Sequence, residues 1–130
     1  FFGCDGMDGI LTVKNFDTSL AEGLMLLTPF STTEESSKAF TEAYVAAYGI
    51  EPNQFAADSY DAVYAIKAAM EKSGVAADAD YSTVCDAFKT AMTEISIDGL
   101  TGAGMTWNAA GEPDKAPKAV KIVNGVYEMQ

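Results

Sequence analysis

Two carboxylates near the start of the chain are the first residues that could do chemistry. Asp5 and Asp8 lie three positions apart in Asp5-Gly6-Met7-Asp8-Gly9, whose repeated Asp-Gly pairs indicate a turn. A pair of carboxylates can serve as general acid and base when both face one substrate. The sequence shows no phosphate-binding loop, nucleophile elbow or metal-ligand set beside them. We therefore predict that the protein is not an enzyme.

The absence of histidine narrows the chemistry further. The 130 residues include no His, which excludes Ser-His and Cys-His nucleophile activation and removes the commonest metal ligand. Two cysteines alone cannot assemble a zinc site. Because Cys4 follows an expected strand and Cys85 lies in an expected helix, we predict free thiols rather than a disulfide. We expect no cofactor and no metal.

The charge balance argues against another class of partner. The chain has 19 Asp and Glu against 8 Lys and Arg, a formal net charge of −11. Such a surface repels nucleic-acid phosphates and anionic lipid head groups, and its simplest role is solubility. No apolar run approaches the roughly 20 residues that a membrane-spanning helix needs. We expect neither a nucleic-acid partner nor a membrane-spanning helix.

Strand patterns occur near both ends of the chain. The apolar run 23–27, closed by Pro29, is typical of a strand that is covered on both faces. Asn124-Gly125 between apolar residues predicts a hairpin with a type I′ turn. We also expect strand segments at Phe1-Phe2-Gly3 and at Met105-Thr106-Trp107.

Three amphipathic helices are expected between these strands. The first follows two overlapping capping boxes in residues 31–35 and ends at Gly49. The second follows Pro52-Asn53, and the third begins near Ser82. Helical spacing predicts that their apolar stripes are buried; these are Phe40, Ala43, Tyr44, Ala47, Tyr48, then Ala62, Val63, Ile66, Ala69, Met70, then Val84, Ala87, Phe88, Ala91, Met92.

The order of elements predicts an α/β domain that is incomplete. Strands, then helices, then strands favour the α/β class. One convincing central strand ahead of three helices leaves too little sheet for the helices to cover. We therefore expect the C-terminal part of a larger protein, or a fragment that must associate to complete its sheets.

Short segments spread over nearly the whole chain form an ordered set. They are Phe1-Phe2-Gly3-Cys4-Asp5-Gly6, Ala21-Glu22-Gly23, Thr28-Pro29-Phe30, Phe40-Thr41-Glu42-Ala43-Tyr44, Tyr48-Gly49, Glu51-Pro52, Ala57-Asp58-Ser59-Tyr60-Asp61-Ala62-Val63, Phe88 through Gly99-Leu100-Thr101-Gly102, Met105-Thr106-Trp107 and Asn108 to Gly111. In this order they resemble the later part of type I periplasmic binding proteins of ABC transporters, in particular the branched-chain amino acid (Leu/Ile/Val) receptors.

The resemblance implies two α/β lobes with parallel sheets flanked by helices, joined by three crossing strands, with the ligand in the cleft between them. On that pattern, residues 1–28 are part of the second lobe. Residues 29–107 form the C-terminal part of the first lobe. Residues 108–130 supply a crossing segment and the closing strands of the second lobe. The remaining parts of both lobes would lie outside this chain.

The resemblance also implies a binding site. Asp5 occupies the position whose acidic residue, more often Glu, pairs with the ligand's α-ammonium group. Gly6 would let the backbone approach the ligand closely, and Phe55 matches an aromatic position that lines the ligand's side chain. Each has a structural alternative: a turn whose carboxylate caps the next segment for Asp5-Gly6, and a core or staple residue for Phe55. Asp58 and Asp61 are expected to cap or brace the second helix instead.

The implied function is that of an extracellular or periplasmic receptor, secreted or lipid-anchored. It would bind a small ligand, an amino acid of the branched-chain type, and present it to an ABC permease. The other implied partner is the rest of its own chain, or a self-associated copy. Two alternatives remain open: a ligand-sensing receptor or regulator domain of the same fold, and a structural fragment that binds no ligand.

Overall fold

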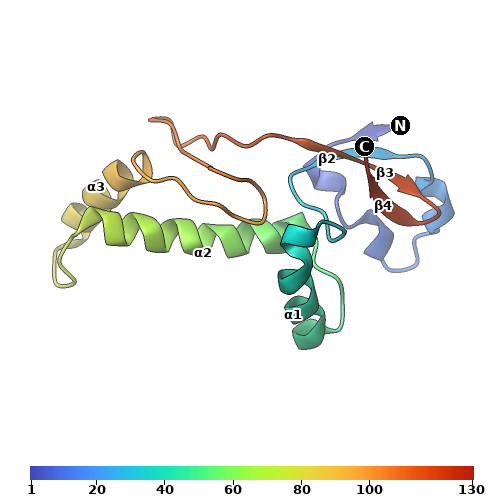
Figure 1. Ribbon diagram of the computed structural model, residues 1–130, viewed down its shortest axis with the longest axis horizontal. Coiled ribbons are helices and arrows are strands. Elements are labelled where there is room, and N and C mark those ends of the chain that lie inside the picture. The colour runs from blue at the N-terminus through green and yellow to red at the C-terminus, as the bar shows by residue number, and fades with distance from the viewer. The chain divides into compact units, whose positions relative to one another are not determined.

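The computed structural model describes residues 1–130, which divide into two compact units (Figure 1). Unit 1 contains Phe1–Ala57 and Ala116–Gln130, and unit 2 contains Asp58–Lys115. Unit 1 holds the whole four-stranded sheet and the first α-helix, whereas unit 2 is built from helices and loops. The predicted α/β class is confirmed.

The sheet of unit 1 has the strand order β1-β2-β3-β4, and both chain ends lie at it (Figure 1). The strands are β1 (Phe2–Gly3), β2 (Met25–Thr28), β3 (Lys118–Val123) and β4 (Val126–Met129). β1 is parallel to β2, and the other two pairs are antiparallel. Leu26 pairs with Val120, and these two residues with Ile122 form the centre of an apolar core.

Burial in β2 alternates along the strand. Leu26 and Thr28 are buried, whereas Met25 and Leu27 are only partly buried. The prediction of equal cover on both faces was therefore too strong for this chain. The predicted hairpin is confirmed: Asn124 and Gly125 have φ angles of 52° and 76°, the two positive values that a type I′ turn requires.

Helix α1 (Lys38–Tyr48) ends as predicted but does not begin as predicted. Gly49 adopts φ 72° and its N–H donates to the Val45 carbonyl at 2.8 Å. The expected capping boxes do not cap α1, because the helix starts after the 3₁₀ helix η4 (Glu35–Ser37). The predicted apolar stripe was wrong as a buried stripe: Ala43, Ala47 and Tyr48 are exposed in this chain.

Helix α2 (Gln54–Ser73) begins in unit 1, and in unit 2 its part from Asp58 onward packs against α3 (Tyr81–Met92) through small side chains. The core of unit 2 contains Ala65, Ala69, Ala91 and Ile95, with Phe88 and Met92 beside them. The third predicted helix is thus confirmed in position. Its predicted apolar face, with Phe88, Ala91 and Met92, packs at this core.

The buried face of α2 is not the predicted one. Asp61, Ala65 and Ala69 are buried at intervals of four residues, whereas Val63, Ile66 and Met70 are 64%, 52% and 39% exposed. Ala62 is exposed as well. Small residues allow the neighbouring segments to approach closely, so they form the contact face. α2 therefore carries a second apolar face with no cover in this chain.

Irregular structure fills the remaining segments. The 3₁₀ helices η1 (Asp5–Met7), η2 (Ile10–Thr12) and η3 (Thr18–Ala21) connect β1 to β2. The expected strand at 105–107 is absent; the bridges Ile97↔Met105 and Trp107↔Pro113 are isolated. Cys4 in unit 1 and Cys85 in unit 2 are free and exposed, as predicted. No helix combines the length and apolar character needed to cross a membrane.

Candidate functional site

The turn that carries Asp5 and Gly6 follows directly after β1. The Asp8 N–H donates to the Asp5 carbonyl at 2.9 Å and closes η1. The turn packs closely against Gly3. A Cβ on Gly3 would lie 2.5 Å from Met7 Sδ and 2.9 Å from a Leu26 methyl group, so the close packing requires glycine at this position. Asp5 and Gly6 are both exposed, and a Cβ on Gly6 would meet no atom within 4 Å. The turn thus presents a carboxylate and an uncrowded backbone to the outside.

The carboxylate that caps a following segment is that of Asp8 rather than Asp5. Asp8 Oδ1 accepts from the Gly9 N–H at 2.9 Å. Asp8 Oδ2 accepts from the N–H of Gln54, the first residue of α2, at 2.7 Å. In the sequence Asp8 stands out only as a possible acid-base partner of Asp5, because no local pattern links residues that lie 46 positions apart.

The first turn of α2 places Phe55 beside this contact. Asn53 Oδ1 accepts from the Ala56 N–H at 3.2 Å and acts as the helix's own N-cap. Phe55, the second residue of α2, is 45% exposed. Its side chain is therefore not a core residue of this chain. All three predicted site residues lie in unit 1, and the structure keeps them at its surface.

A separate cavity of about 470 Å³ lies within unit 1. None of the three predicted site residues lines it, although Asp8 and Asn53, their close neighbours in sequence, do. The lining comes from segments that meet only in the folded chain: Asp8, Gly9, Leu11, Thr12, Thr28, Phe30, Ser31, Thr32, Thr33, Tyr44, Ile50, Glu51, Pro52, Asn53, Val120, Gly125, Val126 and Tyr127. The lining residues share no spacing pattern in the sequence, so the cavity could not be predicted from the sequence.

The cavity lining is acidic. Asp8 and Glu51 contribute carboxylates, and the lining includes no Lys or Arg. Burial raises the pKa of the Tyr127 phenol, and the negative charge of Asp8 raises that pKa further. Both effects keep the phenol neutral. The cavity is thus suited to neutral or cationic groups and not to anions.

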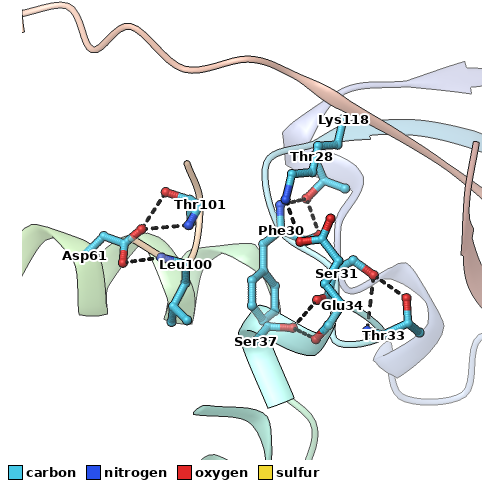
Figure 2. A network of polar contacts seen from close by, with 10 residues as sticks. All are labelled: Thr28, Phe30, Ser31, Thr33, Glu34, Ser37, Asp61, Leu100, Thr101 and Lys118. Carbon is cyan, nitrogen blue, oxygen red and sulfur yellow. Dashed lines mark hydrogen bonds and ion pairs between the residues drawn. The ribbon is translucent and has the colours of Figure 1, made fainter. Parts of the chain in front are cut away.

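A buried polar network fixes the chain between β2 and α1 (Figure 2). Thr28 Oγ1 donates to the Phe30 carbonyl at 3.2 Å and accepts from the Phe30 N–H at 3.3 Å. Ser37 Oγ donates to the Ser31 carbonyl at 2.5 Å, with a second acceptor at the Glu34 carbonyl, 2.9 Å away. These bonds satisfy polar groups inside the unit and give this connection a defined path.

An ion pair joins this connection to the start of β3. Lys118 Nζ lies 2.6 Å from Glu34 Oε2, and the two side chains are 27% and 26% exposed (Figure 2). Partial burial makes such a pair stronger than an open surface pair. The segment that follows β2 and the start of β3 are therefore held together by charge as well as by the sheet.

A second cluster of hydrogen bonds lies wholly within unit 2. Asp61 Oδ1 accepts from the Leu100 N–H at 2.8 Å, and Oδ2 accepts from the Thr101 N–H and hydroxyl at 2.8 and 2.7 Å (Figure 2). Asp58 pairs with Lys115 at 2.8 Å. Both aspartates thus brace α2, as predicted. A Cβ on Gly99 would lie within 2.7 Å of the Asp61 carboxylate atoms, so this loop requires glycine.

Metal ligation finds no support in the side-chain arrangement. No group of three or more Cys, Asp or Glu side chains is placed to hold a metal ion. The exposed turn at Asp5, the start of α2 and the acidic cavity are the candidate features for binding in unit 1.

A protein-family model matches most of the chain. A family model described as "Periplasmic binding protein" matches residues 8–125. No curated protein matches the chain.

Solved structures resemble the chain over almost all of its length. The branched-chain amino acid transporter substrate-binding protein LivJ from Streptococcus pneumoniae, in complex with isoleucine, is 27% identical, with a TM-score of 0.74 over 98% of this chain. The leucine-binding protein LivK from Thermotoga maritima is 22% identical, with a TM-score of 0.73 over 99% of this chain. A solute-binding protein of an ABC transporter from R. palustris, in complex with benzoate, is 20% identical, with a TM-score of 0.71 over 94% of this chain.

Each of these structures matches almost all of this chain, but this chain matches only part of each structure. This chain accounts for 35%, 35% and 32% of their respective lengths. It therefore spans about a third of the proteins that it resembles.

Proposed function

The chain belongs to the periplasmic binding protein family, a family of non-enzymatic binding proteins, and on that premise we propose that it is the C-terminal portion of the solute-binding component of an ABC importer. The match of the family model to residues 8–125 supports the solute-binding assignment, and the C-terminal position is proposed from the sequence resemblance alone. The complete protein would act outside the cytoplasmic membrane, in the periplasm or at the cell surface. Its partners would be a small ligand and the ABC permease.

A larger parent protein is supported by two observations. The chain spans about a third of its solved relatives. Val63, Ile66 and Met70 form an exposed apolar face on α2 that the rest of a complete lobe would cover. We retain the lobe assignment as part of the proposal: residues 1–28 in the second lobe, 29–107 in the first, and 108–130 crossing and closing the second.

The proposed ligand is an amino acid of the branched-chain type. The relative from S. pneumoniae, the most similar in sequence of the three described, holds isoleucine. Asp5 is an exposed carboxylate at the end of a strand, and an ammonium group that is buried in a cleft needs an anionic partner. Phe55, exposed at the start of α2, would supply an apolar wall for the ligand's side chain.

An aromatic carboxylate is the second candidate ligand, because the relative from R. palustris is in complex with benzoate. Benzoate has no ammonium group, so it would give Asp5 no partner and would be repelled by its charge. The proposal therefore predicts that the ammonium group of the ligand is required.

Titration calorimetry on the complete two-lobed protein tests this directly. The panel contains leucine, isoleucine, valine, benzoate and 4-methylpentanoate, which is leucine without its ammonium group. We expect at least one branched-chain amino acid to bind and 4-methylpentanoate not to bind. Binding of benzoate without binding of any amino acid would overturn the choice of ligand. Absence of binding by the whole panel would favour the sensing or structural alternatives.

Gly6→Ala tests whether the ligand approaches the backbone of the turn. The added methyl group meets no atom of the chain within 4 Å, so the unfolding midpoint should not change. If the ligand approaches the backbone at Gly6, its affinity should fall by about tenfold or more, because the methyl group occupies the ligand's space. Calorimetry and thermal unfolding on the same samples separate the two effects. Unchanged affinity would return Gly6 to the role of a simple turn residue.

A further inference from the structure

We propose that Asp8 is a positioning residue that ties the Asp5 turn to the start of α2 and thereby sets the spacing of the two halves of the proposed site. The inference rests on the proposed function. The Asp8 N–H closes the turn at the Asp5 carbonyl at 2.9 Å. Its carboxylate accepts the Gln54 N–H at 2.7 Å, directly before Phe55. One residue thus contacts both segments on which the proposed ligand contacts lie.

The bond from Asp8 is not needed to start α2. Asn53 already caps the helix through its own side chain, with Oδ1 at 3.2 Å from the Ala56 N. Asp8 adds a second acceptor from a segment 46 residues away. The N–H groups of a first helical turn lack partners within the helix, and the helix dipole of the 20-residue α2 favours an anion there. The bond is therefore charge-assisted, and it joins two segments rather than forming one of them.

The backbone next to Asp8 is shaped for this close approach. Gly9 has φ 84°, a left-handed conformation that glycine adopts without strain. A Cβ on Gly9 would lie 3.5 Å from Asn53 Nδ2, so the two segments are in contact at this point. Gly9 and Asn53 both line the cavity beside Asp8. Glycine at position 9 thus allows the Asp8 carboxylate to reach the first turn of α2.

The lobe assignment gives the tie a specific consequence. Asp8 belongs to the segment 1–28, assigned to the second lobe, and Gln54 belongs to 29–107, assigned to the first. Both residues lie in unit 1 of this chain, so the bond holds the two segments side by side. In the complete protein we expect it to keep the segments together around a ligand that contacts both Asp5 and Phe55. Losing it should speed ligand release far more than it slows ligand capture, because the diffusional encounter does not depend on it.

Stopped-flow kinetics on the complete two-lobed protein, with leucine as the probe, tests this consequence. Asp8→Ala should raise the dissociation rate constant about tenfold and leave the association rate constant within about twofold, the change expected for one helix-terminal hydrogen bond. Asp8→Asn keeps only one of the two oxygen acceptors, which serve the Gly9 and Gln54 N–H groups, and it loses the charge, so it should restore only part of the slow dissociation. Asp17→Ala is the matched control, since Asp17 caps η3 through Ser19 in the same segment.

A change in unfolding midpoint alone, with both rate constants unchanged in Asp8→Ala, would overturn the tie and leave the proposed function intact. Hydrogen exchange at the Gln54 amide tests the tie without any ligand. We expect exchange about tenfold faster in Asp8→Ala and an intermediate rate in Asp8→Asn, which keeps one neutral acceptor. Equal exchange in all variants would refute the tie. If the unaltered protein binds no leucine, the proposed function with this probe fails, and the exchange result still decides the role of Asp8.

Discussion

Replacing Asp5 with alanine in the complete two-lobed protein is expected to weaken the binding of a branched-chain amino acid by about a hundredfold or more. An ammonium group that is buried between two lobes without an anionic partner loses several kcal/mol, and each 1.4 kcal/mol is about a factor of ten in affinity. The exposed Asp5 side chain makes no contact on which the fold depends, so the unfolding midpoint should not move. Calorimetry with leucine and isoleucine measures the loss.

Two further variants give this prediction its specificity. Asp78→Ala removes the same charge from an exposed loop position of unit 2 and should leave affinity unchanged, which separates a direct contact from a general effect of net charge. Asp5→Glu keeps the carboxylate and provides the residue that is commoner in the branched-chain receptors; it should retain binding. Equal affinity of the original protein and Asp5→Ala would remove Asp5 from the site and leave it as a turn residue.

The second large effect is expected on stability. Asp61→Ala should lower the free energy of unfolding of the 130-residue chain by about 3 kcal/mol, because it leaves buried donors unpaired. Asp61 is 6% exposed and Thr101 is fully buried, with three hydrogen bonds between the Asp61 carboxylate and residues 100–101. Urea unfolding can be followed through Trp107, the chain's single tryptophan, which packs against the core of unit 2.

Matched variants divide this effect among its parts. Thr101→Val removes one hydroxyl donor and keeps both backbone donors, so a loss of about 1 kcal/mol is expected. Asp58→Ala breaks the partly exposed pair with Lys115 and should cost less than about 1 kcal/mol. If Asp61→Ala cost no more than Asp58→Ala, the loop at residues 100–101 would not depend on the carboxylate.

Elements with a local chemical signature could be predicted from the sequence. Asn124-Gly125 supplies two residues that accept positive φ angles, and Gly49 ends α1 in the same left-handed conformation. The α3 stripe was also predicted, because one apolar face meets one core. The predicted capping boxes do not form because the Ser31 side chain has other local partners. Its hydroxyl accepts from the Thr33 N–H and lies 2.8 Å from the Thr33 hydroxyl.

The buried face of α2 could not be predicted from hydrophobicity alone. Val63, Ile66 and Met70 are the more apolar choice, but the segments of unit 2 pack on the alanine face, where small side chains permit close approach. The prediction assumed that other elements pack on the face with Val63, Ile66 and Met70, and this chain contains no such elements. The candidate site shows the same limit: the turn at Asp5 and Gly6 was predictable, whereas the contact of Asp8 with Gln54 depends on tertiary structure over 46 residues.

The positions of the two thiols allow the chain to be labelled with fluorescent dyes at its natural cysteines. Cys4 and Cys85 are exposed and free, with one in each compact unit. Maleimide dyes can therefore be attached without introducing any new cysteine into this chain. In the complete protein, energy transfer between the two dyes would test whether binding of the proposed ligand changes the distance between residues 4 and 85. Because Cys4 directly precedes Asp5, the emission of its dye alone should also respond to solutes that reach the turn.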